Sequence, residues 1–143
     1  MPNANYTHTI TLYNCLKAMD SPDKKDHWYQ YVLDKCYYKA AVTRVDTGTN
    51  AGMQNVYTVR IPASMDYLPY REWARLTDEE RKQMFTLSLD DIVIHGICLE
   101  EISSMSGQAS VQVLKRYKPD SFKVTAVSDN TGALHSKHYR LGG

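Results

Sequence analysis

A strict alternation of side-chain types near the amino terminus constrains the fold more than any other feature of the sequence. Tyr6, His8, Ile10 and Leu12 alternate with the threonines at positions 7, 9 and 11. Because successive side chains of a β-strand point to opposite faces, the aromatic and aliphatic residues share one face and the threonines share the other. The segment therefore predicts an opening strand.

Further runs of aromatic and β-branched residues predict more strands, and eleven tyrosines strengthen this preference for pleated structure. The runs cover residues 28–33, 37–45, 55–61, 85–89, 92–95, 97–102, 122–127 and 134–141. The first two are interpreted as a hairpin joined at residues 34–36. Pro62 should end the strand at residues 55–61, because proline has no N–H group to donate to a neighbouring strand. Asp90 and Asp91 suit a tight turn between strands.

One helical region is expected after Pro69. Residues 70–76 suit a short turn of helix, and Thr77 with Glu80 forms a capping box that opens a second helix over residues 78–84. Trp73, Leu76 and Met84 should face the barrel. Residues 111–117 fit either a short amphipathic helix or a loop.

Length and the absence of a linker or repeat predict a single domain over residues 1–143. The expected fold class is all-β, mainly an antiparallel barrel or sandwich, with a short helical insertion around residues 69–84. Glycine, asparagine, aspartate and threonine are concentrated in residues 46–54, which predicts a flexible surface loop.

Charge and cysteine usage exclude several classes of function. Seventeen basic and sixteen acidic residues leave a net charge of +1, which argues against a protein whose main role is to bind nucleic acid phosphates. Three cysteines without a CxxC pair suggest neither a disulfide framework nor a four-cysteine zinc site. Neither a signal sequence nor a membrane-spanning run is recognisable, so we expect synthesis in the cytosol and no membrane partner.

No constellation of residues predicts catalysis, so we expect neither an enzyme nor a cofactor. His95, Cys98, His135 and His138 are the only metal-like set, but positions 135 and 138 of a strand point to opposite faces. We therefore expect no metal site. Ser103, Ser104 and Ser106 are interpreted as loop residues with solvated hydroxyls, not as nucleophiles. No phosphate-binding glycine motif occurs in the sequence.

A cluster of basic residues in the last third could bind single-stranded nucleic acid. It consists of Lys115, Arg116, Lys118 and Lys123, with Tyr117 and Phe122 interleaved. A solvated rim is the simpler interpretation. An OB-like nucleic-acid binder and a metal-dependent hydrolase remain the alternatives from other functional classes.

Several motifs resemble a family of small proteins from the structural gene clusters of tailed phages that infect Gram-positive bacteria. The similar segments run nearly end to end and include ITLYN at 10–14, HWYQYVL at 27–33, VRIP at 59–62, YLPYREWARL at 67–76, DDIVIHG at 90–96, VTAVSDN at 124–130 and HYRLGG at 138–143. Two positions depart from the family. Asp90 stands where a glycine is expected, and Tyr139 where tryptophan is common.

The resemblance implies a non-enzymatic virion protein of the head-tail connector or minor capsid type. By analogy of fold, the plan is also similar to head-closure or stopper proteins that ring the portal exit. The implied partners are further copies of this chain, portal or adaptor proteins and tail proteins. Contact with packaged DNA is implied only if a loop reaches the channel. A tail-completion or minor capsid protein is the alternative.

A ring subunit needs two complementary surfaces, because head-to-tail contacts join different faces of neighbouring copies. The predicted loop and the helical insertion are the candidate surfaces, with the basic cluster as a third. The candidate contact residues are Asp46, Thr47, Gly48, Thr49, Asn50, Trp73, Arg75, Arg81, Lys115 and Arg116.

Overall fold

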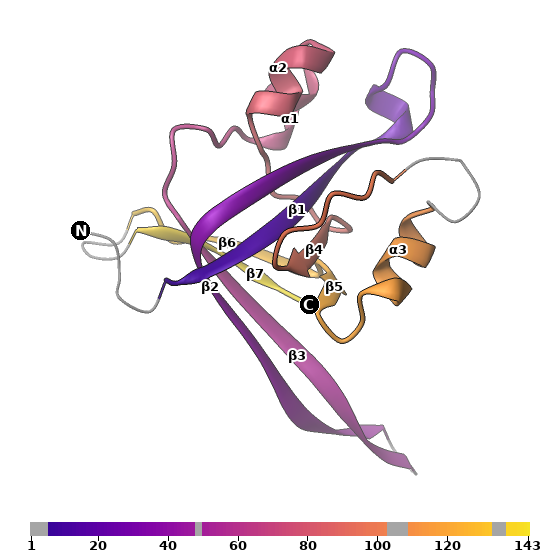
Figure 1. Cartoon of the computed structure of the whole chain (residues 1–143), viewed down its shortest axis with the longest axis vertical. Helices are drawn as coiled ribbons and strands as arrows, with labels where there is room; N and C mark the ends of the chain where they lie inside the picture. Colours follow the sequence, from indigo (N-terminus) through magenta and orange to yellow (C-terminus); the bar gives the residue numbers. More distant parts are fainter. Residues whose placement is uncertain (1–5, 48–49, 103–108, 133–136) are drawn as a thin grey trace.

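A single curved antiparallel sheet of seven strands forms the protein, in the order β5-β4-β1-β2-β3-β7-β6 (Figure 1). The computed structural model describes residues 6–47, 50–102, 109–132 and 137–143, with the backbone alone over residues 43–55. The strands are β1 (His8–Leu16), β2 (His27–Thr47), β3 (Asn50–Pro62), β4 (Ile92–His95), β5 (Ser121–Lys123), β6 (Ala126–Asp129) and β7 (His138–Gly142). The short helices are η1 (Ala18–Asp20), α1 (Tyr70–Ala74), α2 (Asp78–Gln83) and α3 (Ser110–Arg116). The predicted all-β class with a short helical insertion is confirmed.

β2 is one continuous strand of 21 residues, so the hairpin predicted at residues 34–36 is wrong. Its first part pairs with β1, from His27 to Cys36, and its second part pairs with β3 from Tyr37 onward. Lys35 has a φ of 57° and lies where these two partners change. A single left-handed residue bends the strand without reversing it, and the bend carries the chain from one half of the sheet into the other.

The second part of β2 and the first part of β3 form a long hairpin arm, which we define as residues 41–56. The flexible loop predicted over residues 46–54 is wrong, because residues 46–47 and 50–54 belong to these strands. The register pairs Asp46 with Ala51 and Thr47 with Asn50. Cross-strand pairing outweighs the turn preference of this composition.

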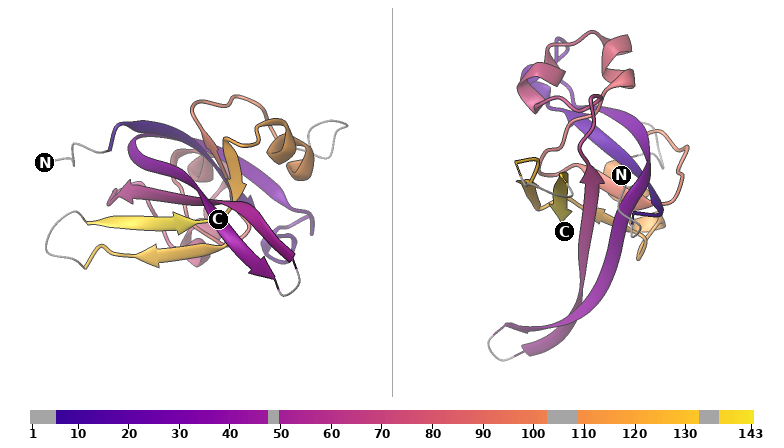
Figure 2. Two further views of the ribbon diagram at one scale, coloured as in Figure 1. Left: turned by 90° about the horizontal axis from the view of Figure 1, so that it is seen from below. Right: turned by 90° about the vertical axis from the view of Figure 1, so that its left-hand side faces the viewer.

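The two edges of the sheet, β5 and β6, are consecutive in the chain, so the sheet curls into a half-barrel (Figure 2). Between them, the Val124 N–H donates to Asp91 O and the Thr125 N–H donates to Gly142 O. Apolar side chains from all parts of the chain fill the concave side. The largest fully buried members of this core are Ile10, Leu12, Val59, Ile61, Phe85, Val93, Phe122 and Leu141.

β1 is buried on both faces from Ile10 to Leu16. Its second face is covered by α3 and by residues 97–102, which bury Tyr13, Ile94, Cys98 and Val113 in a separate cluster. The helical alternative at residues 111–117 is therefore the correct one, because Val113 of α3 closes this cluster.

Two predicted strands are absent from the described residues. Residues 85–89 contain one isolated bridge, from Phe85 to Tyr67, and residues 97–102 pair with no strand. Both segments nevertheless bury apolar side chains, among them Phe85 and Cys98. Residues 122–127 are shared between β5 and β6, while the last strand begins at His138. Burial of an apolar run therefore does not require ladder pairing here.

Candidate functional site

The hairpin arm is the first candidate site, because it extends beyond the barrel as a two-stranded ribbon (Figures 1 and 2). At its base Val42 is 62% exposed and Val56 is 40% exposed. Asp46, Thr47 and Asn50, three of the predicted contact residues, lie on the arm's strands near its end. Gly48 and Thr49 lie outside the described residues. The backbone of the arm is therefore a projection from the half-barrel.

The barrel anchors the arm through aromatic side chains. The Tyr57 ring stacks on Phe122 at a centroid distance of 4.8 Å, and the Tyr57 hydroxyl donates to Pro119 O at 2.9 Å. Tyr38, on the neighbouring strand, is also buried and stacks on His95 at 4.2 Å. The base of the arm is therefore held rigidly while its outer part leaves the core.

Two predicted contact residues in the helical insertion are structural. Trp73 is fully buried and packs edge-to-face on Tyr29 at 5.4 Å. Arg81 is 8% exposed, donates to Leu76 O at 2.5 Å and lies over the Tyr29 ring at 5.4 Å. The prediction that Trp73 and Arg81 contact a partner is therefore wrong, because both attach the insertion to β2. Arg75 is exposed, so it stays a candidate for contact with a partner.

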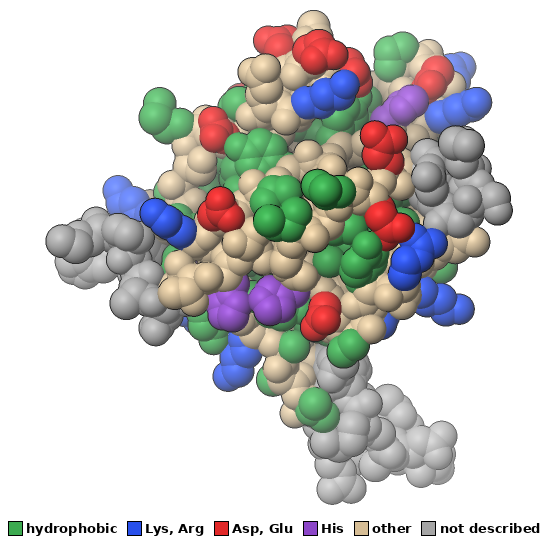
Figure 3. Space-filling view, in the orientation of Figure 1, with side chains coloured by type: hydrophobic (Ala, Val, Ile, Leu, Met, Phe, Trp, Pro, Cys, Tyr) green, Lys and Arg blue, Asp and Glu red, His purple; other side chains and the backbone are tan. Residues whose placement is uncertain are grey.

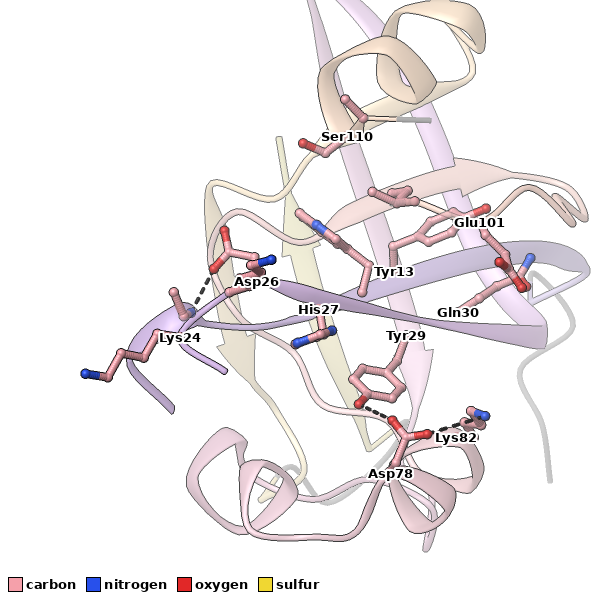
Figure 4. A pocket seen from close by; sticks show the side chains of 15 residues that line it. Tyr13, Lys24, Asp26, His27, Tyr29, Gln30, Asp78, Lys82, Glu101 and Ser110 are labelled. Carbon is pink, nitrogen blue, oxygen red and sulfur yellow. Dashed lines mark hydrogen bonds and ion pairs between the residues drawn. The ribbon is translucent and has the colours of Figure 1, made fainter. Parts of the chain in front are cut away.

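A groove of about 970 Å³ is the second candidate site (Figure 4). It lies between the start of β2, α2 and the beginning of α3, at the opposite end of β2 from the arm. Tyr13, Trp28 and Ile102 supply its apolar lining. Its charged side chains are of both signs and comprise Lys24, Lys25, Lys82, Asp26, Asp78 and Glu101.

Hydrogen bonds fix one wall of this groove. The Tyr29 hydroxyl donates to Asp78 at 2.5 Å, and Lys82 lies 3.5 Å from the same carboxylate (Figure 4). Burial and the bond to Asp78 raise the pKa of Tyr29 to about 12, while the same bond lowers the pKa of Asp78. The wall therefore presents an ionised carboxylate and a neutral phenol at neutral pH.

Two of the four basic residues in the cluster of the last third form ion pairs. Arg116 forms an ion pair with Glu100, and Lys123 lies 3.6 Å from Asp90. Phe122, predicted as a stacking residue, is buried in the barrel core. Lys115 is exposed on α3. The predicted contact residues thus occupy three separate places: the arm, Arg75 after α1, and Lys115 with Arg116 on α3.

A buried polar group that the sequence analysis assigned to a turn lies behind β1. Asp91 is fully buried, and its carboxylate accepts hydrogen bonds from Asn14 Nδ2 and the backbone N–H groups of Cys15 and Ser88, all at 3.0–3.1 Å. Burial raises the pKa of Asp91 to about 7, against the lowering effect of these donors. Asp90 does form the expected turn, with a φ of 74°.

The three described members of the predicted metal-like set, His95, Cys98 and His138, are not grouped for a metal ion. His95 contacts His8, with Nδ1 of His8 3.1 Å from Nε2 of His95, whereas Cys98 accepts a hydrogen bond from the Tyr13 hydroxyl. Figure 3 shows two neighbouring histidine side chains near the base of the arm. His135 lies outside the described residues. Within the described part of the chain, no three His, Cys, Asp or Glu side chains are grouped for a metal ion.

Comparison with known proteins finds one family. A family described as "Family of unknown function (DUF6751)" matches residues 5–143. No curated protein and no solved structure matches the chain. None of the helices over the described ranges has the length and apolar character to cross a membrane.

Proposed function

We infer the function of this chain, which belongs to DUF6751, a family of unknown function, from its own residues and surfaces. We propose that it is a non-enzymatic ring subunit of a tailed-bacteriophage particle, located in the neck where head meets tail. Its partners there would be further copies of itself, portal or adaptor proteins and tail proteins. A tail-completion or minor capsid protein remains the alternative within the particle. The resemblance of its motifs to small phage structural proteins supports this proposal.

The hairpin arm is the observation that carries the proposal. Six strand residues beyond Ala41 extend it by about 20 Å at roughly 3.3 Å per residue. A two-stranded ribbon alone is marginally stable in water, because one pair of strands buries little apolar surface. An arm of this length therefore gains stability when it packs on another surface, and assembly supplies that surface.

The positions of the arm and the groove suit a closed ring. The groove lies where β2 begins, at His27, and the arm lies where the strand ends, at Thr47. A head-to-tail ring requires two different, complementary surfaces on each subunit. We propose that the arm of one copy packs on the next copy, with the groove as the acceptor surface.

A shortened arm tests this role. Residues 44–53 are replaced by Asn-Gly, so that Thr43 and Gln54, which are cross-strand partners, flank a two-residue turn. The pair Thr43–Gln54 lies four residues along the ladder from the pair Thr47–Asn50. Because this shift is an even number of residues, the remaining side chains of the hairpin stay on the same faces of the sheet. The matched control keeps the full arm and places the same Asn-Gly pair at positions 48 and 49.

Both versions are introduced into the gene of the phage that encodes the chain, and purified particles are quantified by mass spectrometry against the portal protein. We expect roughly six or twelve copies of the control chain per particle, as a closed ring requires. The short-arm chain should fold with the same unfolding midpoint but be lost from particles. Hundreds of copies, absence of the natural chain from particles, or normal incorporation of the short-arm chain would contradict the proposal.

A further inference from the structure

The outer face of β3 and β7 carries a row of basic and aromatic side chains. Cross-strand register places Tyr37, Arg60 and Arg140 in one row across β2, β3 and β7. Lys39 stands opposite Thr58, two residues along the same strands. Side chains opposite each other in an antiparallel pair share a face, and Tyr57, Val59 and Leu141 occupy the other face in the core.

Arg60 and Arg140 are direct cross-strand partners. Like charges in this position destabilise a sheet, since the side chains are only about 5 Å apart at Cβ. Among the described residues, neither guanidinium forms an ion pair; the cations that do are Lys17, His27, Lys82, Arg116 and Lys123. The repulsion between Arg60 and Arg140 is therefore uncompensated within the described chain.

The Arg60 side chain is held in place and lacks an acceptor. Its guanidinium lies 5.2 Å from the centroid of the Tyr37 ring, which orients it. Its Nε atom is buried and has no hydrogen-bond partner. Because Nε has no solvent exposure, a ligand can reach only the outer nitrogens of this half-buried guanidinium, which Tyr37 holds in a fixed orientation.

We propose that this face, formed by Tyr37, Lys39, Arg60 and Arg140, binds the phosphate backbone of double-stranded DNA. Phosphate oxygens accept bidentate hydrogen bonds from guanidinium groups, and two neighbouring arginines match successive backbone charges. The strand positions that share this face hold no acidic residue: they are 37, 39, 58, 60, 126, 128, 138 and 140. The face is thus positive although the chain carries a net charge of only +1.

Two observations favour DNA over an acidic protein surface. Neighbouring cations without intervening acids suit a regularly charged polymer, whereas protein surfaces normally mix both signs. The face also lies on regular strands, which hold its cations at fixed spacing, and contacts to the phosphate backbone need no base-specific side chain. The proposal does not depend on ring formation, because it concerns the isolated chain.

Binding to a fluorescent duplex of about 24 base pairs, measured at several salt concentrations, tests the face. We expect the logarithm of the affinity to fall with the logarithm of salt at a slope near −3, for three phosphates neutralised by Lys39, Arg60 and Arg140. Arg60→Gln with Arg140→Gln should weaken binding at least about tenfold near 50 mM salt and reduce the slope to about −1.

Arg71→Gln is the control for Arg140→Gln, since both arginines are exposed and both changes remove one positive charge. Arg71→Gln should leave the affinity and the slope unchanged. Arg60→Lys keeps the charge and should retain the slope while losing the bidentate contact. Thermal unfolding of each variant verifies that it folds.

Three outcomes would overturn the proposal. The first is that no duplex binding is detected near 50 mM salt. The second is that Arg140→Gln and Arg71→Gln reduce the affinity for the duplex equally. The third is that Lys115→Gln with Lys118→Gln reduces this affinity while the arginine changes do not. Binding of a poly-glutamate peptide with no binding of DNA would assign the face to an acidic protein instead. These results are separable from the arm experiment, which measures incorporation into particles.

Discussion

Asn14 and Asp91 form a hydrogen bond of 3.0 Å in the interior of the protein, although the sequence assigned Asp91 to a turn. Asn14 also bonds both the carbonyl and the N–H group of Thr86, at 2.5 and 3.2 Å. One side chain of β1 therefore ties down residues 86–91, which have no strand partner over that stretch. This network takes the place of the ladder that the predicted strand at residues 85–89 would have made.

The first prediction concerns the pH dependence of stability. Burial raises the pKa of Asp91 from 3.8 to about 7. The folded state thus holds this proton more tightly than the unfolded state, and the associated stability is present below about pH 4 and lost as the pH rises through about 7. We expect the free energy of unfolding, relative to Asp91→Asn, to fall by up to about 4 kcal/mol over that range.

Denaturant unfolding at several pH values measures this difference. Carboxyl groups with a lowered pKa, such as Asp78 and Asp129, act in the opposite direction but cancel between the two proteins. Asp90→Asn is the matched control, because Asp90 is the exposed neighbour. A difference between the natural chain and Asp91→Asn that stays constant with pH would contradict the assignment.

The second prediction separates structural from exposed residues in the helical insertion. Trp73→Ala should lower the free energy of unfolding by about 3–5 kcal/mol, because it removes a fully buried ring that packs on Tyr29. Arg75→Ala should change it by no more than about 0.5 kcal/mol. Chemical denaturation compares them, and similar effects for both would show that the insertion does not depend on Trp73.

The third prediction concerns thiol reactivity. Burial raises the pKa of both Cys15 and Cys36 to about 12, and Cys98 is 2% exposed. Since the thiolate is the reactive form, the folded chain should resist iodoacetamide at about pH 8, whereas the unfolded chain should be labelled at all three positions. Intact-mass spectrometry counts the labels. Rapid labelling of the folded chain would mean that these thiols are reached without unfolding.

The fourth prediction tests the repulsion between Arg60 and Arg140. Arg140→Glu replaces a like-charged cross-strand pair with an opposite pair, so it should stabilise the protein by roughly 0.5 kcal/mol at low salt. The gain should largely vanish near 1 M salt, where charges are screened within about 3 Å. Thermal unfolding at both salt concentrations measures it, with Arg140→Gln as the intermediate control. Destabilisation at low salt would show that another group already neutralises the pair.

The local features of the fold could be predicted from the sequence because they depend on neighbouring residues. Tyr57, Val59 and Ile61 alternate with polar neighbours, and all three face the core as that pattern predicts. The capping box of Thr77 and Glu80 forms, and Pro62 is the last residue of β3. Each of these outcomes follows from side-chain direction or from a hydrogen bond within a few residues.

The remaining features depended on contacts between distant residues, which only the tertiary structure decided. Residues 34–36 can either reverse a strand or bend it, and the pairing of β2 with both β1 and β3 selected the bend. Turn-forming residues at 46–54 became strands because each found a cross-strand partner. Trp73 and Asp91 are buried by segments far away in the chain, and the opposition of Arg60 to Arg140 is set by register. Sequence patterns determine which residues prefer a pleated or helical backbone, whereas partner and burial are properties of the assembled sheet.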